Sequence, residues 1–191
     1  MAFIAPADAS IRNSHFEPLN QAMFHINMFH IKKFVFILLI SLACVACDQS
    51  SKHLAVKYLQ PLGPLSCCYD TLRLQYTENT GAMLSVGESL SKQARFWIFV
   101  VFVFAILSAL AIYAYTTSFR YRLKIFGLSL ITGGGFSNLI DRIINNGAVV
   151  DFMNLGIGHL RTGIFNIADF LIFIGIAIAL IFHRHKTGNA G

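Results

Sequence analysis

Four long apolar segments constrain this chain more than any other feature of its sequence. A helix needs about twenty residues to cross the hydrocarbon core of a bilayer, and each segment comes close to that length. A backbone in lipid must satisfy its own hydrogen bonds, so each segment is expected to be helical. They run from about Phe34 past Asp48, from Phe96 to Tyr115, from about Ile125 to Ile144, and from about Ile164 to Phe182.

The composition agrees with a membrane protein. Of the 191 residues, 55% are hydrophobic and only 13% are charged, which lies outside the usual range of a soluble domain. The sequence therefore predicts an all-α membrane protein with four transmembrane helices.

Basic residues flank the apolar segments on the side expected to be cytoplasmic. Such a bias marks the inner face of a membrane, so both termini are expected in the cytoplasm. The formal net charge of +6 then reflects orientation in the membrane, and no nucleic-acid partner is expected. The basic groups are Lys32 and Lys33, then Arg120, Arg122 and Lys124, and finally Arg184 and Lys186.

The first segment expected on the outer side, residues 59–92, is polar and irregular. Within residues 71–77, Leu72, Leu74 and Tyr76 alternate with polar residues, the period of a half-buried strand. Residues 78–81, which come next, include Asn79 and Gly81, residue types that favour turns. A small β element is expected on the outer membrane surface.

These patterns divide the chain into three segments. Residues 1–30 show no clear period and are expected to form a disordered extension. Residues 31–186 are expected to form a single four-helix membrane domain, and residues 187–191 a short tail.

Four carboxylates are expected at one depth, near the outer ends of the helices. They are Asp48, Asp141, Asp151 and Asp169. A charged side chain at a helix centre in a bilayer costs about 2.5–3.5 kcal/mol, so each one is a functional candidate.

Two of these carboxylates have basic neighbours. Asp48 precedes Lys52 by four residues, the better orientation for an ion pair on a helix. Asp141 stands next to Arg142, and a structural role as a helix cap or as a partner of that arginine is expected. Asp151 and Asp169 have no basic residue within four positions, so these two carboxylates are the ones expected to pair with each other.

A pair of carboxylates can hydrolyse a peptide bond by holding one proton between them. Two like charges about 4 Å apart repel by about 4 kcal/mol at an effective dielectric constant near 20. That separates the two ionisations by roughly three pKa units, enough to keep one group protonated near neutral pH. Such a pair titrates as a unit.

Other catalytic signatures are missing from the sequence. It contains no serine or cysteine nucleophile motif, no HExxH, no phosphate-binding loop and no zinc spacing. A peptidase that uses neither metal nor cofactor is therefore the hypothesis that Asp151 and Asp169 favour.

Five short blocks carry a family resemblance. They are Asp48-Gln49-Ser50-Ser51-Lys52, Glu78-Asn79-Thr80-Gly81-Ala82, Gly133-Gly134-Gly135-Phe136-Ser137-Asn138-Leu139-Ile140-Asp141-Arg142, Val149-Val150-Asp151-Phe152 and Phe165-Asn166-Ile167-Ala168-Asp169. In this order they resemble the motif blocks of the lipoprotein signal peptidases, or type II signal peptidases. One departure is Ser137, where the family usually has glycine.

The resemblance implies a membrane aspartyl endopeptidase of the bacterial inner membrane. Such an enzyme removes signal peptides from prolipoproteins, cutting just before the diacylglyceryl-modified cysteine. The outer side becomes the periplasmic side, where the β element and the active site are expected. The implied partners are lipid-modified prolipoproteins and membrane lipids, and the enzyme is expected to be monomeric.

The resemblance also assigns residues. It implies that Asp151 and Asp169 are the catalytic pair. The implied substrate-binding or supporting residues are Asn79, Gly81, Asn138, Arg142, Asn166, Asp48, Lys52 and Asp141.

Two other functions fit part of the sequence. Intramembrane Asp and Arg residues also mark proton or ion pathways, but those would spread carboxylates through the membrane thickness. Residues 32–44 resemble a lipoprotein signal, which would make the chain a substrate with Cys44 as its lipidation site. Ser41 stands where a bulky leucine is expected, and three more apolar segments follow.

Overall fold

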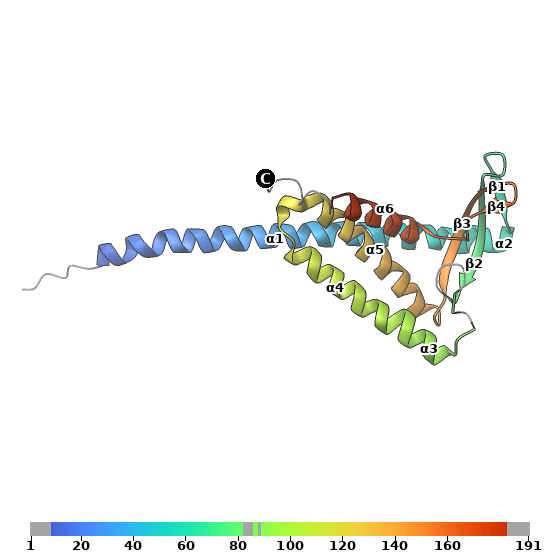
Figure 1. Ribbon diagram of the computed structural model, residues 1–191, viewed down its shortest axis with the longest axis horizontal. Coiled ribbons are helices and arrows are strands. Elements are labelled where there is room, and N and C mark those ends of the chain that lie inside the picture. The colour runs from blue at the N-terminus through green and yellow to red at the C-terminus, as the bar shows by residue number, and fades with distance from the viewer. Residues whose placement is uncertain (1–8, 82–85, 88, 183–191) are drawn as a thin grey trace, which may run out of the picture. The chain divides into compact units, whose positions relative to one another are not determined.

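The computed structural model describes residues 9–81, 86–87 and 89–182, with side chains from Met28 onward. Its helices occupy the four apolar segments (Figure 1). They are α1 (Ala9–Leu54) with its continuations η1 (Ala55–Leu59) and α2 (Gln60–Leu62), α3 (Lys92–Phe96) continued by η3 (Trp97–Phe102) and α4 (Val103–Thr116), η4 (Phe119–Tyr121) followed by α5 (Arg122–Ile144), and α6 (Ile167–Ile181).

Three helical stretches are long and apolar enough to cross a membrane. They are Met28–Leu62, Lys92–Thr116 and Phe119–Ile144. The fourth predicted segment is helical as well, but α6 has only 15 residues. A mostly helical protein with membrane-spanning helices is therefore confirmed, whereas four crossings stay a prediction.

The chain divides into two compact units, Met1–Phe36 and Ile37–Gly191. Helix α1 begins at Ala9 and runs through most of the predicted amino-terminal extension. The domain limits at residues 30 and 186 stay predictions. Every candidate site residue lies in the second unit.

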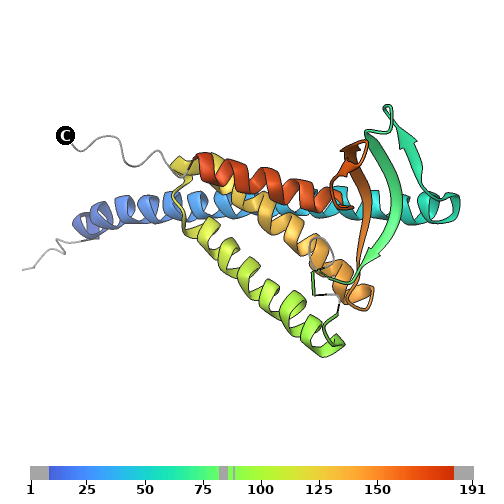
Figure 2. The ribbon, with the colours of Figure 1, turned by 45° about the vertical axis from the view of Figure 1, so that its right-hand side comes forward.

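The small sheet has four antiparallel strands in the order β1-β2-β3-β4. Figure 2 shows it at one end of the helices. The strands are β1 (Leu65–Cys67), β2 (Leu72–Asn79), β3 (Val149–Ile157) and β4 (Leu160–Arg161). The predicted strand at residues 71–77 corresponds to β2, which continues to Asn79 into the predicted turn.

Strand β3 was not predicted from the sequence. Val149, Val150, Asp151 and Phe152 are all buried, so the strand has no alternation of polar and apolar residues for a period-two pattern to reveal. Its pairing with β2 shifts register between Leu74 and Thr77. Beyond that shift, Thr77 stands opposite Asp151, and the sheet carries this carboxylate into the protein.

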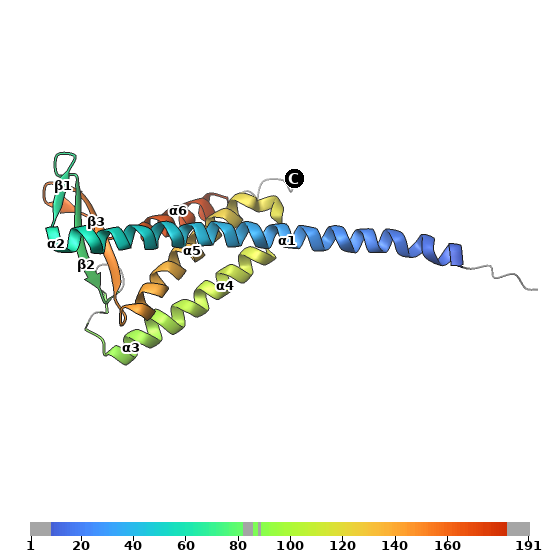
Figure 3. The ribbon, with the colours of Figure 1, turned by 180° about the vertical axis from the view of Figure 1, so that it is seen from behind.

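Three consecutive glycines let the helices converge on α5. A Cβ atom on Gly133 would lie 2.8 Å from the Cα of Ser41 in α1, and one on Gly134 would lie 2.7 Å from the carbonyl oxygen of Ala168 in α6. A Cβ atom on Gly135 would overlap Leu107 in α4. Successive helical residues point about 100° apart, so each glycine admits a different neighbour. Figure 3 shows α5 between α4 and α6.

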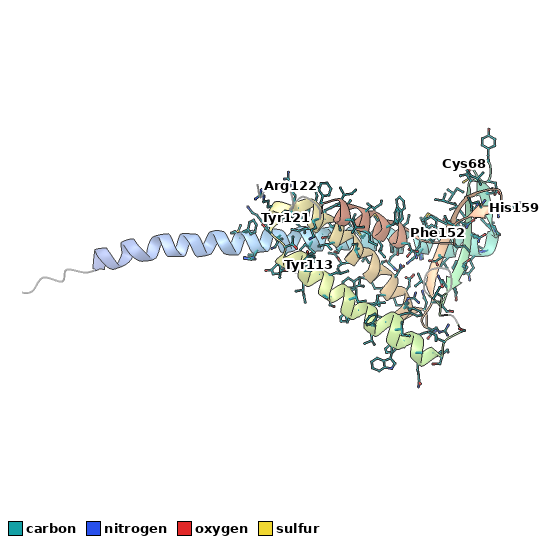
Figure 4. All side chains as sticks on the ribbon, viewed as in Figure 1. Cys68, Tyr113, Tyr121, Arg122, Phe152 and His159 are labelled. Carbon is teal, nitrogen blue, oxygen red and sulfur yellow. The ribbon has the colours of Figure 1, made fainter. Side chains whose placement is uncertain are left out.

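The helical bundle has one end that carries the sheet and an opposite end where α4 connects to α5. Figure 4 places Tyr113, Tyr121 and Arg122 at one end and Phe152 and His159 at the other. At the sheet end, the buried Phe152 packs in a small core with Ala55 and Leu59 from η1, which joins the sheet to the end of the first long helix.

Candidate active site

Asp151 lies on β3 and is 3% exposed. One carboxylate oxygen, Oδ1, accepts a hydrogen bond from Nδ2 of Asn166 at 2.7 Å. The other, Oδ2, accepts one from Nδ2 of Asn79 at 3.0 Å. Both partners are amides, so both hydrogen bonds favour the ionised carboxylate without neutralising its charge.

Asp169 lies in the first turn of α6, whose amino terminus is built as a capping box. The side-chain oxygen of Asn166 accepts a hydrogen bond from the backbone N–H of Asp169 at 2.9 Å. In return, Oδ2 of Asp169 accepts one from the backbone N–H of Asn166 at 3.2 Å. Its second oxygen, Oδ1, accepts a hydrogen bond from Asn138 at 2.9 Å. Asn166 therefore contacts both carboxylates and holds them close together.

A buried lysine joins the helices behind this pair. The Nζ atom of Lys52 lies 2.6 Å from Oδ2 of Asp48 and 2.8 Å from Oδ2 of Asp141. It also donates a hydrogen bond to Oδ1 of Asn138 at 2.8 Å. An ammonium group has three donors, and all three have acceptors here. The Asp48–Lys52 pair expected from the four-residue spacing is confirmed.

Asp48 and Asp141 each fix the backbone beside one member of the pair. Asp48 accepts a hydrogen bond at 2.8 Å from the backbone N–H of Ala168, the residue before Asp169. Asp141 accepts one at 3.1 Å from the backbone N–H of Val150, the residue before Asp151. The ion network therefore fixes the backbone position from which each candidate catalytic side chain extends.

Of the two structural roles expected for Asp141, pairing with Arg142 is not found: Asp141 pairs with Lys52 instead. Adjacent residues on a helix point in different directions, and Asp141 turns toward Lys52. Arg142 instead donates hydrogen bonds to the carbonyl oxygens of Gly147 at 3.0 Å and Gly81 at 2.7 Å. The backbone N–H of Gly81 donates to Asn79 at 3.0 Å. Arg142 thus supports Asp151 through Gly81 and Asn79.

Two residues matter more than the sequence suggested. Ser137, where the resemblance leads to glycine, donates a hydrogen bond to Asp48 at 2.7 Å and accepts one from Gln49 at 3.0 Å. Gln49 also donates to Asp141 at 2.7 Å. Both lie inside the matched blocks, but only their contacts with Asp48 and Asp141 give them a role.

Burial is the main electrostatic influence on Asp151. It raises the pKa of this carboxyl to about 6, the hydrogen bond from Asn79 lowers the pKa, and the nearby Asp169 raises it. The pair therefore retains a proton at a higher pH than an exposed aspartate does. Among the described residues, no group of three or more His, Cys, Asp or Glu side chains is arranged to hold a metal ion.

Known proteins match most of the chain. Residues 40–184 match the family model described as signal peptidase (SPase) II. The lipoprotein signal peptidase of Oleidesulfovibrio alaskensis is 33% identical over 156 residues, covering 81% of this chain and 98% of that relative. The lipoprotein signal peptidase of Geobacillus thermodenitrificans is 31% identical over 155 residues, covering 79% of this chain and 93% of that relative.

Two solved structures are also similar to this chain. One is described as a bacterial membrane enzyme solved by the in meso method at 2.3 Å resolution. It superposes with a TM-score of 0.67 at 26% identity, over 81% of this chain and 93% of that chain. A second, at 1.9 Å resolution, gives a TM-score of 0.65 at 26% identity.

Proposed function

Because the chain belongs to the signal peptidase II family of aspartic peptidases, we propose that Asp151 and Asp169 are the pair that performs its catalysis. The protein removes signal peptides from prolipoproteins, as the family does. The observation that carries the assignment is that Asn166 contacts both carboxylates. Its side chain donates a hydrogen bond to Asp151, and it exchanges two hydrogen bonds with Asp169 in the cap of α6.

The pair has the groups that peptide hydrolysis requires. A water molecule between the carboxyl groups loses a proton to the ionised one as its oxygen attacks the scissile carbonyl carbon. The protonated carboxyl gives its proton to the carbonyl oxygen, which forms a tetrahedral diol. The carbon–nitrogen bond then breaks as the protonated carboxyl gives its proton to the leaving nitrogen and a hydroxyl of the diol gives its proton to the other carboxylate. The products are the amine and a carboxylic acid, which ionises in solution. The pair ends with one proton, as it began.

The supporting residues keep this pair in place. Asn79, Asn138 and Asn166 donate to its oxygens. The remaining supporting residues, Asp48, Lys52, Asp141, Arg142 and Gly81, act at one step removed, through the backbone next to the pair or through these amides.

The proposed topology has four membrane crossings with both termini in the cytoplasm, and it sets the depth of the active site in the membrane. Arg120 lies in η4, in the connection between α4 and α5, and Arg122 and Lys124 lie in the first turn of α5. The positive-inside rule assigns this basic end to the cytoplasm. The sheet and the pair then lie at the periplasmic surface, where a diacylglyceryl-modified cysteine would be anchored.

Peptide cleavage by the purified protein tests this function. A lipobox peptide with a diacylglyceryl-modified cysteine is expected to be cut immediately before that cysteine, as read by mass spectrometry. The same peptide without the lipid is expected to be cut at least about tenfold more slowly, because it is not held at the membrane boundary. Equal rates for the two peptides, or a cut elsewhere, would contradict the proposal.

The pH profile tests the hydrogen bond from Asn79. The pair must keep one proton, so the rate is expected to fall as the pH rises above about 6, where Asp151 loses it. Asn79 donates to the ionised carboxylate and so lowers this pKa. Asn79→Ala should therefore move the alkaline limb of the profile upward by about one pH unit, because a hydrogen bond to a charged group is worth about 1.5–3 kcal/mol.

A matched control is Asn145→Ala, which removes an exposed amide at the carboxyl end of α5. Its pH profile should follow that of the wild type. An alkaline limb that stays in place or moves to lower pH in Asn79→Ala would show that this amide does not act on Asp151.

A further inference from the structure

A polar pocket lies at the sheet end of the helices, and its described lining includes neither Asp151 nor Asp169. Its volume is about 290 Å³. It opens between the start of the α3–η3 helix and the carboxyl end of α5. The residues that the argument uses from its lining are Lys92, Arg95, Phe96, Phe99, Arg142 and Asn146.

Three cations line this pocket: Lys92, Arg95 and Arg142. Within the described part of the chain, none of the ion pairs includes Lys92, Arg95 or Arg142. Among the described residues, Arg142 donates to two backbone carbonyl oxygens, and its guanidinium lies 5.0 Å from the ring centre of Phe99. The carboxylates of Asp141, Asp151 and Asp169 attract Arg142, but Lys92 and Arg95 have no ion pair in the described part of the chain. The positive charge of these two residues therefore attracts an anion from outside the protein.

The surroundings indicate which anion fits. Phe96 is 53% exposed and the neighbouring Trp97 is 64% exposed. Both belong to a stretch apolar enough to cross a membrane, so hydrocarbon chains would lie along this helix directly beside the cations. Arginine and lysine bind phosphate oxygens well. We propose that this pocket binds the phosphate headgroup of an anionic phospholipid whose acyl chains lie along α3 and η3.

The pocket is joined to the proposed active site by a short series of contacts. Arg142 donates to the carbonyl oxygen of Gly81, whose N–H donates to Asn79, which donates to Asp151. A lipid phosphate held beside Arg142 would therefore stand next to the support of the catalytic pair. This link rests on the proposed function, whereas the binding itself does not.

Trp97 provides a direct assay, because it is the only tryptophan in the chain. The purified full-length protein is placed in neutral detergent micelles with brominated phosphatidylglycerol or brominated phosphatidylcholine, which quench nearby indole fluorescence. The wild type is expected to prefer the anionic lipid. The variant with Lys92→Gln and Arg95→Gln should lose that preference by about fivefold for each charge removed, since a cation near an anionic lipid contributes about 1 kcal/mol.

The matched control carries Lys57→Gln and Arg120→Gln. It removes the same charge from exposed positions outside the pocket lining and should keep the preference of the wild type. Equal losses in the two variants would show a general effect of surface charge and would overturn the site.

Two further readings complete the test. Inorganic phosphate, added at constant ionic strength, should leave quenching by phosphatidylglycerol unchanged; if it removes the preference, the pocket takes free phosphate and the lipid assignment fails. Cleavage of the lipid-modified peptide in neutral detergent should be the same in the pocket variant and the wild type. A wild type that prefers the anionic lipid but cleaves nothing would refute the proposed function and leave the lipid site standing.

Discussion

Replacing either Asp151 or Asp169 by asparagine is expected to lower the rate of signal-peptide cleavage by about 10⁴-fold. Asparagine keeps the size and much of the hydrogen bonding of aspartate, but it can neither take the proton from water nor return one to the substrate. Each carboxyl group accepts one proton and gives up one proton during the cycle, so loss of either one should stop the reaction. The measurement is the initial rate on the diacylglyceryl-modified peptide.

The folded state should survive the change at Asp151. Burial raises the pKa of this carboxyl above its ordinary value of 3.8 to about 6. The folded protein therefore binds the proton more tightly than the unfolded chain, and stability is lost as the pH rises through this interval. At neutral pH the ionised form costs about 3 kcal/mol, a net value that already includes the favourable hydrogen bonds from Asn79 and Asn166.

Asp151→Asn removes that charge, so its thermal unfolding temperature at neutral pH should equal or exceed that of the wild type. Asp70→Asn is the matched control, because Asp70 lies on the β1–β2 turn and pairs with Arg73. This control should cleave at the wild-type rate. Substantial cleavage by either Asp151→Asn or Asp169→Asn would remove that residue from the catalytic pair.

Replacing Lys52 by methionine is expected to destabilise the protein by about 3–5 kcal/mol. The lysine is 3% exposed and its ammonium lies against two carboxylates. Methionine fills much of the same volume, yet it leaves Asp48 and Asp141 buried without a counter-charge. Because those carboxylates hold the backbone before Asp169 and Asp151, cleavage should fall together with stability. Thermal unfolding in detergent measures the first effect and peptide cleavage the second.

Two further variants separate charge from packing. Lys57→Met makes the same substitution at an exposed position five residues later and should leave the unfolding temperature within about a degree of the wild type, as surface substitutions usually do. Combining Lys52→Met with Asp141→Asn removes one unpaired charge and should restore part of the stability. Unchanged stability in Lys52→Met alone would mean that the ion network does not hold the fold.

Local sequence spacing was enough to predict some of these features. The four helical segments follow from unbroken apolar sequence, and β2 follows from the alternation over residues 71–77. The ion pair between Asp48 and Lys52 lies four residues apart on one helix, so its spacing alone indicates it. The cap of α6 is also local, since Asn166 and Asp169 are three residues apart, but it was not predicted.

Contacts between distant segments could not be predicted in the same way. Asp141 pairs with Lys52 from another helix, and no local pattern distinguishes that partner from the adjacent Arg142. Strand β3 lacked a period because both of its faces are buried where it carries Asp151. The two catalytic candidates come from different elements, so their joint contact with Asn166 depends on the packing of β3 against the start of α6. The family resemblance, rather than the spacing, brought these positions together.

Infrared difference spectroscopy of the protonated carboxyl band tests the shared proton most directly. The wild type at a pH where it cleaves substrate should show a protonated carboxyl signal that belongs to the pair. In Asp169→Asn that signal should be lost at a lower pH than in the wild type, because the charge of Asp169 no longer raises the pKa of Asp151. A signal that is lost at the same pH in Asp169→Asn, or that is missing from the active wild-type protein, would contradict a catalytic pair holding one proton.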